Sequence, residues 1–77
     1  MSSEHIETRK KIEDIPSVST FDNLLDSSTL SEEDKHIMRL HYIEDRDFSY
    51  IGEELGYSES WLKKRHRKML KKLRKLI

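Results

Sequence analysis

The strongest local signals in this 77-residue sequence lie in one stretch, Leu55-Gly56-Tyr57-Ser58-Glu59-Ser60-Trp61-Leu62. Gly56 follows an amphipathic run and has no Cβ, so it suits the left-handed conformation that commonly ends a helix. Ser58 suits the N-cap of a second helix, because its hydroxyl can accept a hydrogen bond from a free backbone N–H. Together these features are typical of a helix-turn-helix. Any small bundle also needs such turns, so this stretch alone favours DNA binding and plain packing equally.

The composition indicates one small domain. The chain has 34% hydrophobic and 39% charged residues, which predicts a small core under a highly charged surface. It has no cysteine, so neither a disulfide framework nor a thiolate metal site is expected. No apolar run approaches the roughly 20 residues needed to cross a bilayer, and no segment resembles a secretory signal. We therefore expect a cytoplasmic protein without a membrane partner.

The charge is distributed unevenly along the chain. Residues 59–77 contain nine Lys or Arg and one Glu, which gives +8, and residues 1–58 contain the remaining six Lys or Arg and fourteen Asp or Glu, which gives −8. Nine cations within nineteen residues repel one another, so their clustering is better explained by a polyanionic partner than by a solvated surface.

Hydrophobic periodicity predicts an all-α fold, a small three- to four-helix bundle that contains the helix-turn-helix. Helices are expected over residues 19–26, over 31 to about 44, from 47 or 48 to 55, and from 59 toward the C-terminus. Ser19 and Ser31 are the expected N-caps of the first two. We expect a common core formed by Leu40, Ile51, Leu55, Leu62 and Leu73. Gly52 is a poor helix former, so it predicts a close packing contact at that position.

The first 18 residues differ from the rest. Ile6, Ile12 and Ile15 are isolated among charged residues, and Pro16 interrupts any helix that they could form. The sequence therefore predicts a flexible N-terminal arm over residues 1–18 and a helical domain over residues 19–77.

The second helix of a DNA-binding helix-turn-helix reaches base edges with its first two turns. Phosphates are contacted further along. The candidate DNA-binding residues are Glu59, Ser60, Trp61, Lys63, Lys64, Arg67, Lys68 and Lys71. Trp61 has two interpretations: contact with a thymine methyl or a sugar, or packing against Tyr57 or the preceding helix. His66 likewise fits either the edge of the core or a phosphate contact.

Neither catalysis nor metal binding is indicated. The four histidines, His5, His36, His41 and His66, are scattered and lack metal-ligand spacing. No nucleophile stands in a recognisable pattern with a base, and so small a domain is a poor host for a substrate cleft. The sequence thus predicts a protein that is not an enzyme and has no cofactor.

Five segments between residues 30 and 75 carry a family resemblance: Leu30-Ser31-Glu32-Glu33-Asp34, Met38-Arg39-Leu40-His41-Tyr42, Phe48-Ser49-Tyr50-Ile51-Gly52-Glu53-Glu54-Leu55-Gly56, Tyr57-Ser58-Glu59-Ser60-Trp61-Leu62-Lys63 and Leu70-Lys71-Lys72-Leu73-Arg74. They resemble region 4 of sigma-70-type bacterial sigma factors. The segment Arg39-Leu40-His41-Tyr42-Ile43, with Gly56-Tyr57-Ser58, is also similar to small phage regulators of the ArpU and RinA kind, which control late or lytic genes.

The resemblance implies binding of double-stranded DNA at a promoter-like site, with RNA polymerase as a second partner. A complete sigma factor also needs region 2, for which 77 residues leave no room. Trp61 and His66 depart from the residues common at their positions. We therefore expect a sequence-specific transcription regulator of bacterial or phage origin, with residues 59–75 in the major groove. The alternative is a module that binds polymerase, sigma or anti-sigma proteins, with DNA binding secondary. A helical bundle without nucleic acid is disfavoured by the +8 segment.

Overall fold

A computed structural model describes residues 3–76, and within that range it contains five helices and no strand. The helices are α1 (Ser3–Glu13), α2 (Val18–Asp26), α3 (Glu32–Tyr42), α4 (Phe48–Leu55) and α5 (Glu59–Arg74). The predicted all-α class is confirmed. The bundle has one helix more than expected, because α1 was predicted to be part of an arm.

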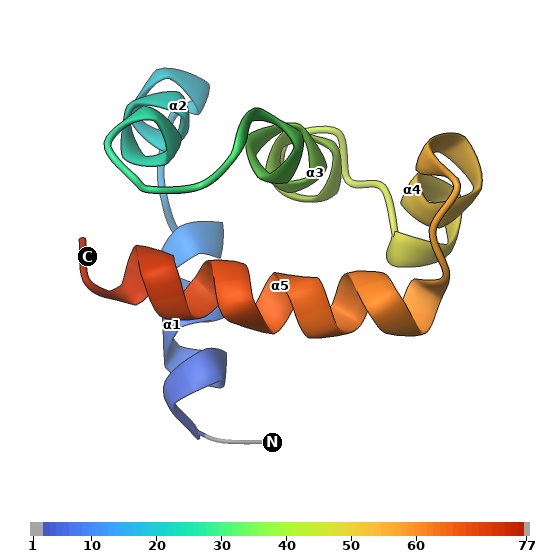
Figure 1. Cartoon of the computed structure of the whole chain (residues 1–77). Coiled ribbons are helices and arrows are strands. Elements are labelled where there is room, and N and C mark those ends of the chain that lie inside the picture. Colours follow the sequence, from blue (N-terminus) through green and yellow to red (C-terminus); the bar gives the residue numbers. More distant parts are fainter. Residues whose placement is uncertain (1–2, 77) are drawn as a thin grey trace.

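The longest helix, α5, is the base on which the others pack. Figure 1 shows α2, α3 and α4 in a row along one side of α5, while α1 runs steeply across its C-terminal half. Direct packing joins α1 to α5, α4 to α5 and α3 to α4. One side of α5 is thereby covered, and its other side faces solvent.

Four of the five helices begin at a capping side chain. Ser17, Ser31, Asp47 and Ser58 each accept a hydrogen bond from the backbone N–H three residues later, at distances of 3.1, 3.2, 2.8 and 3.1 Å. This is the standard N-cap arrangement, and it satisfies a donor that the helix itself leaves unpaired. The expected cap at Ser19 is wrong, because Ser17 follows Pro16 in extended backbone and starts α2 two residues earlier.

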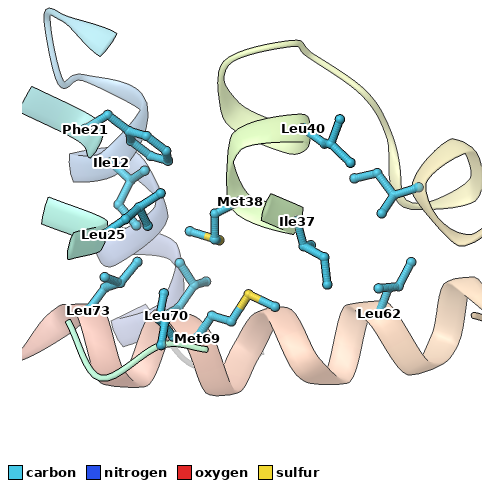
Figure 2. Packing of buried hydrophobic residues seen from close by; sticks show 12 residues of the cluster. Ile12, Phe21, Leu25, Ile37, Met38, Leu40, Leu62, Met69, Leu70 and Leu73 are labelled. Atoms are coloured by element: carbon cyan, nitrogen blue, oxygen red, sulfur yellow. The ribbon is translucent and has the colours of Figure 1, made fainter. Parts of the chain in front are cut away.

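The core is made of aliphatic side chains from all five helices, as Figure 2 shows. Leu40, Ile51, Leu62 and Leu73 are buried, as expected. Leu55 is only half-buried and packs at the margin, because it is the last residue of α4 and lies beside the exposed Gly56. The remaining buried apolar residues are Ile12, Phe21, Leu25, Leu30, Ile37, Met38, Met69 and Leu70.

The first helix differs from the expectation of a loose arm. Residues 3–13 form α1, which buries Thr8 and Ile12 and packs on α5. Figure 2 places Ile12 near Phe21 and Leu25 of α2, so one buried side chain joins α1 to the next helix of the chain. Ile6 remains 53% exposed. Residues 1 and 2 of the predicted arm lie outside the described residues.

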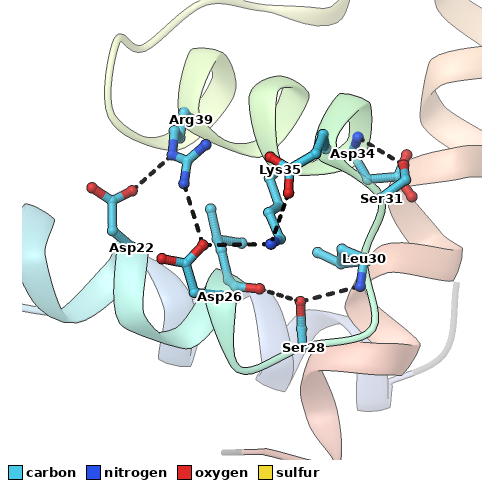
Figure 3. Close-up of polar contacts among 10 residues, drawn as sticks. Asp22, Asp26, Ser28, Leu30, Ser31, Asp34, Lys35 and Arg39 are labelled. Atoms are coloured by element: carbon cyan, nitrogen blue, oxygen red, sulfur yellow. Dashed lines mark hydrogen bonds and ion pairs between the residues drawn. The ribbon is translucent and has the colours of Figure 1, made fainter.

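Charged side chains tie α2 to α3 at the surface (Figure 3). The Arg39 Nε donates to Asp22 Oδ1 at 2.8 Å, and the Lys35 Nζ lies 3.4 Å from Asp26 Oδ1. Such partly exposed pairs contribute little stability each. The two acids of α2 are thereby neutralised by cations of α3, so cations of α5 are not required to neutralise them.

Candidate nucleic-acid interface

Two glycines shape the turn between α4 and α5: Gly52 lies within α4, and Gly56 directly follows that helix. Gly56 has φ 82°, the left-handed conformation expected for the residue after a helix. The backbone N–H groups of Gly56 and Tyr57 both donate to the Gly52 carbonyl, at 2.8 and 2.9 Å. A Cβ on Gly52 would lie 2.4 Å from the Tyr57 carbonyl oxygen. The predicted close contact at Gly52 is therefore confirmed, and the turn's own backbone supplies it.

The recognition-helix candidate α5 has two distinct sides. Its buried side consists of Leu62, His66, Met69, Leu70 and Leu73. All eight candidate DNA-binding residues are exposed: Glu59, Ser60, Trp61, Lys63, Lys64, Arg67, Lys68 and Lys71. The spacing that places the apolar residues in the core thus leaves the predicted contact residues on accessible parts of the same helix.

The cations of α5 are not equally available. Lys63 forms an exposed ion pair with Glu59 at 3.3 Å. Among the side chains that the structure describes, Lys64, Arg67, Lys68 and Lys71 have no ion-pair partner. Lys72 of the same helix likewise has none among them. Cations without an acidic partner in the described part of the chain are the ones that an external polyanion would neutralise.

Arg65 behaves differently from its neighbours, and sequence reasoning did not select it. Its Nε donates to an oxygen of Asp34, and its Nη2 lies 4.0 Å from Glu33 Oε1. Asp34 is buried, so this pair fixes α5 to the first turn of α3. The acids at the start of α3 indicated only favourable charge at a helix N-terminus. The four-residue spacing of Tyr57, Trp61 and Arg65 was the signal that could have indicated contact among them.

Arg65 also contacts the ring of Trp61. This ring stacks on Tyr57 with centroids 4.0 Å apart and an interplanar angle of 20°, and the Arg65 guanidinium lies 5.0 Å from its centroid. The side chain nevertheless remains 37% exposed. The packing contact with Tyr57 is therefore present, and part of the indole still reaches solvent near the start of α5.

His66 belongs to the edge of the core. It is 7% exposed, and its Nε2 lies 2.6 Å from the Tyr42 Oη. Its ring also contacts His41 and Phe48. Burial raises the pKa of Tyr42, so this phenol stays neutral at ordinary pH. Of the two interpretations of His66, the structure supports the packing one.

Two hollows border α5. One, of about 400 Å³, lies beside Trp61 and Arg65 and is lined by Lys64, Lys68 and Lys72. The other, of about 740 Å³, is lined by residues of α1, α4 and α5, among them Lys10, Phe48 and Arg67. Among the side chains that the structure describes, those of residues 6–76, no group of histidine and acidic residues could hold a metal ion. No helix in that range is both long and apolar enough to cross a membrane.

An α4–turn–α5 unit with a buried apolar side and an exposed cationic side is a DNA-binding helix-turn-helix module of the kind used in transcription. The family described as "Sigma-70, region 4" matches residues 28–75, and the chain belongs to this family. The match contains all of α3, α4 and α5, whereas α1 and α2 precede it. No curated protein and no solved structure matches the chain.

Proposed function

We propose that this protein is a sequence-specific transcription regulator of bacterial or phage origin that places α5 in the major groove of promoter-like DNA. The supporting observation is that four of the predicted contact residues on α5, the cations Lys64, Arg67, Lys68 and Lys71, have no acidic partner among the described side chains. They stand on a helix that follows the turn typical of groove-binding proteins. Family membership adds a DNA-binding precedent for α3, α4 and α5.

The position of each side chain along α5 suggests its role. Residues near the N-terminus of a recognition helix approach base edges, which assigns Glu59, Ser60, Lys64 and Arg67 to base contact. Arg and Lys can donate to guanine O6 and N7, and Glu59 can accept from cytosine N4. Lys68 and Lys71 lie further along the helix, and we assign them to phosphates. The exposed Lys63–Glu59 pair can open when DNA supplies other partners.

The test compares two alanine variants of exposed α5 cations, so that each serves as control for the other. Binding of Arg67→Ala and Lys71→Ala is titrated against a selected duplex and a random duplex at several salt concentrations. Lys71→Ala should weaken binding to both duplexes equally and reduce the salt slope by about one unit. Arg67→Ala should lose about 1–3 kcal/mol on the selected duplex and less on the random one.

Two results would contradict the proposal at different levels. Equal losses for Arg67→Ala on both duplexes would remove this residue from base contact. A parent protein whose binding to any duplex does not depend on salt would refute DNA binding itself. Circular dichroism of both variants checks that helix content is unchanged, which we expect because both side chains are exposed.

The alternative function, a module that binds RNA polymerase or a sigma or anti-sigma protein, is favoured by one observation. Val18 is 55% exposed and Ile43 is 36% exposed, and both line a hollow of about 240 Å³ together with Phe21 and Tyr42. A pull-down from bacterial lysate with and without nuclease separates the two functions. Capture of polymerase that survives nuclease treatment and is lost in Val18→Ser would support the alternative. Capture that disappears with nuclease would support DNA binding.

A further inference from the structure

We propose that Trp61 contributes sequence preference by presenting the edge of its ring to a thymine methyl group, and that Tyr57, Arg65 and Glu33 are positioning residues that hold it in that orientation before DNA arrives. This proposal rests on the proposed function, because it concerns the same DNA-facing side of α5. It names the group on the DNA that is recognised, the thymine methyl. It also gives a positioning role to three side chains that do not themselves touch DNA.

Two side chains hold the indole within the protein. Tyr57 stacks at a centroid distance of 4.0 Å, and the Arg65 guanidinium lies 5.0 Å from the same centroid. Tyr57 precedes Trp61 by four residues and Arg65 follows it by four. The parts of the ring that these two side chains cover are closed to a base, which reduces the area left for stacking.

The two covering groups are themselves held by the first turn of α3. The Tyr57 hydroxyl donates to both carboxylate oxygens of Glu33, at 2.9 and 3.0 Å. This hydrogen bond raises the pKa of Tyr57, so the phenol remains a donor at neutral pH. Arg65 donates to Asp34, which is 7% exposed and would be left as a buried unpaired charge without it. The stack is thus anchored at both of its ends.

Part of the ring remains accessible. Trp61 is 37% exposed, and it is the third residue of α5, within the part of a recognition helix that approaches bases. The rim is mostly C–H, which suits an apolar contact. Thymine is the base that offers an apolar group in the major groove, its C5-methyl. An aromatic edge fixed in one orientation distinguishes this methyl better than a mobile one does, because no rotamer freedom is lost on contact.

The same geometry explains why Arg65 is not among the phosphate-binding cations. Its guanidinium is shared between Asp34, Glu33 and the indole ring, so it is neutralised within the fold. Lys64 and Lys68, which line the neighbouring hollow, have no such partner among the described side chains. We infer that the protein assigns adjacent cations of one helix to two tasks, positioning and phosphate contact.

The first arm of the experiment removes a single methyl group from the DNA. Each thymine of a selected duplex is replaced in turn by deoxyuridine, and binding of the parent protein is titrated. One position should weaken binding by about three- to five-fold, the size expected for losing one buried methyl group. Trp61→Ala should bind the thymine and deoxyuridine versions of that duplex equally. Trp61→Phe, which keeps an aromatic ring, controls for loss of fold.

The second arm tests positioning through a signal that does not require DNA. Trp61 is the only tryptophan in the chain, so its fluorescence anisotropy decay, excited at a wavelength that tyrosine does not absorb, reports on one side chain. Tyr57→Phe and Glu33→Ala, which remove the donor and the acceptor of the same hydrogen bond, should both increase indole motion and lower the thymine preference. The double variant should add nothing further. Tyr50→Phe, an exposed tyrosine on α4, is the matched control and should change neither signal.

The outcomes separate this proposal from the one on which it rests. Sequence-specific, salt-dependent binding without an effect of any deoxyuridine would refute the thymine contact and leave the proposed function intact. Unchanged indole motion and unchanged thymine preference in both Tyr57→Phe and Glu33→Ala would overturn their positioning role. If no duplex is bound at all, the proposed function fails and the thymine contact fails with it, while the anisotropy decay still decides whether the stack is rigid.

Discussion

The helix α1 and the α4–α5 unit are held in place by different kinds of interaction. The ends of α4 and the start of α5 are fixed locally, by the Asp47 and Ser58 caps and by the left-handed Gly56 between them. Of the α1 side chains that the structure describes, only Thr8 and Ile12 are buried. The α4–α5 unit therefore has local and tertiary stabilisation together, whereas α1 depends on tertiary contact with α5.

The largest effect is expected from removing a buried side chain of the α4–α5 unit. Leu62 is completely buried in α5, so Leu62→Ala should lower the free energy of unfolding by about 2–5 kcal/mol. A domain of this size has only about 5 kcal/mol in total, so the variant should be largely unfolded at about 37 °C by circular dichroism. Leu76→Ala is the control, because Leu76 is 46% exposed. A thermal midpoint unchanged by Leu62→Ala would contradict the core described above.

Substitutions at Gly52 and at Gly56 should destabilise the protein for different physical reasons. Gly52→Ala places a methyl group against the Tyr57 carbonyl oxygen and should cost about 1–3 kcal/mol through overpacking. Gly56→Ala meets no atom within 4 Å but must adopt φ 82°, which costs about 1–2 kcal/mol. Asparagine tolerates that conformation, so Gly56→Asn should recover part of the loss. Thermal unfolding of the three variants measures this; equal losses for Gly56→Ala and Gly56→Asn would exclude a backbone origin.

The smallest loss of stability is expected from a substitution in α1, and the resulting unfolding should be confined to that helix. Ile12→Ala removes the buried apolar anchor of this helix and should cost about 1–2 kcal/mol, since α1 can detach before the rest unfolds. Amide exchange should then accelerate across residues 6–13 and change little in α4. Ile6→Ala, at an exposed position, serves as control. If exchange accelerated equally in α4, the two regions would form one cooperative unit and the comparison would fail.

The contrast between these regions also explains which features could be predicted from the sequence. The caps at Ser31 and Ser58 and the left-handed Gly56 are local features, and each lies where the sequence indicated. The start of α4 was expected at 47 or 48, and Asp47 proves to be its cap. Helix α1 could not be predicted in the same way, because Ile12 is stabilised by tertiary contact with α2 and because α1 packs on α5, which is remote in sequence. Leu55 followed the apolar spacing correctly but lies at a helix end, which spacing does not reveal.

The candidate interface shows the same limit. Helical spacing was sufficient to place all eight predicted DNA-binding residues on exposed positions of α5, and their contact with DNA stays a prediction. The pairing of Arg65 with Asp34 spans 31 residues and depends on how α3 crosses α5. No local pattern contains that crossing. The role of Glu33 in holding Tyr57 was missed for the same reason.

The separation of charge between α5 and the acidic remainder of the chain has a practical consequence for handling the protein. Its formal net charge is zero and its isoelectric point is about 6.9, so near neutral pH no overall repulsion keeps copies apart. The basic side of α5 on one molecule can then attract the acidic segments of another. Added salt screens that attraction over about 10 Å at 0.1 M ionic strength. Purification buffers should therefore keep the protein dissolved better at moderate salt than at low salt, and dilution into water should precipitate it.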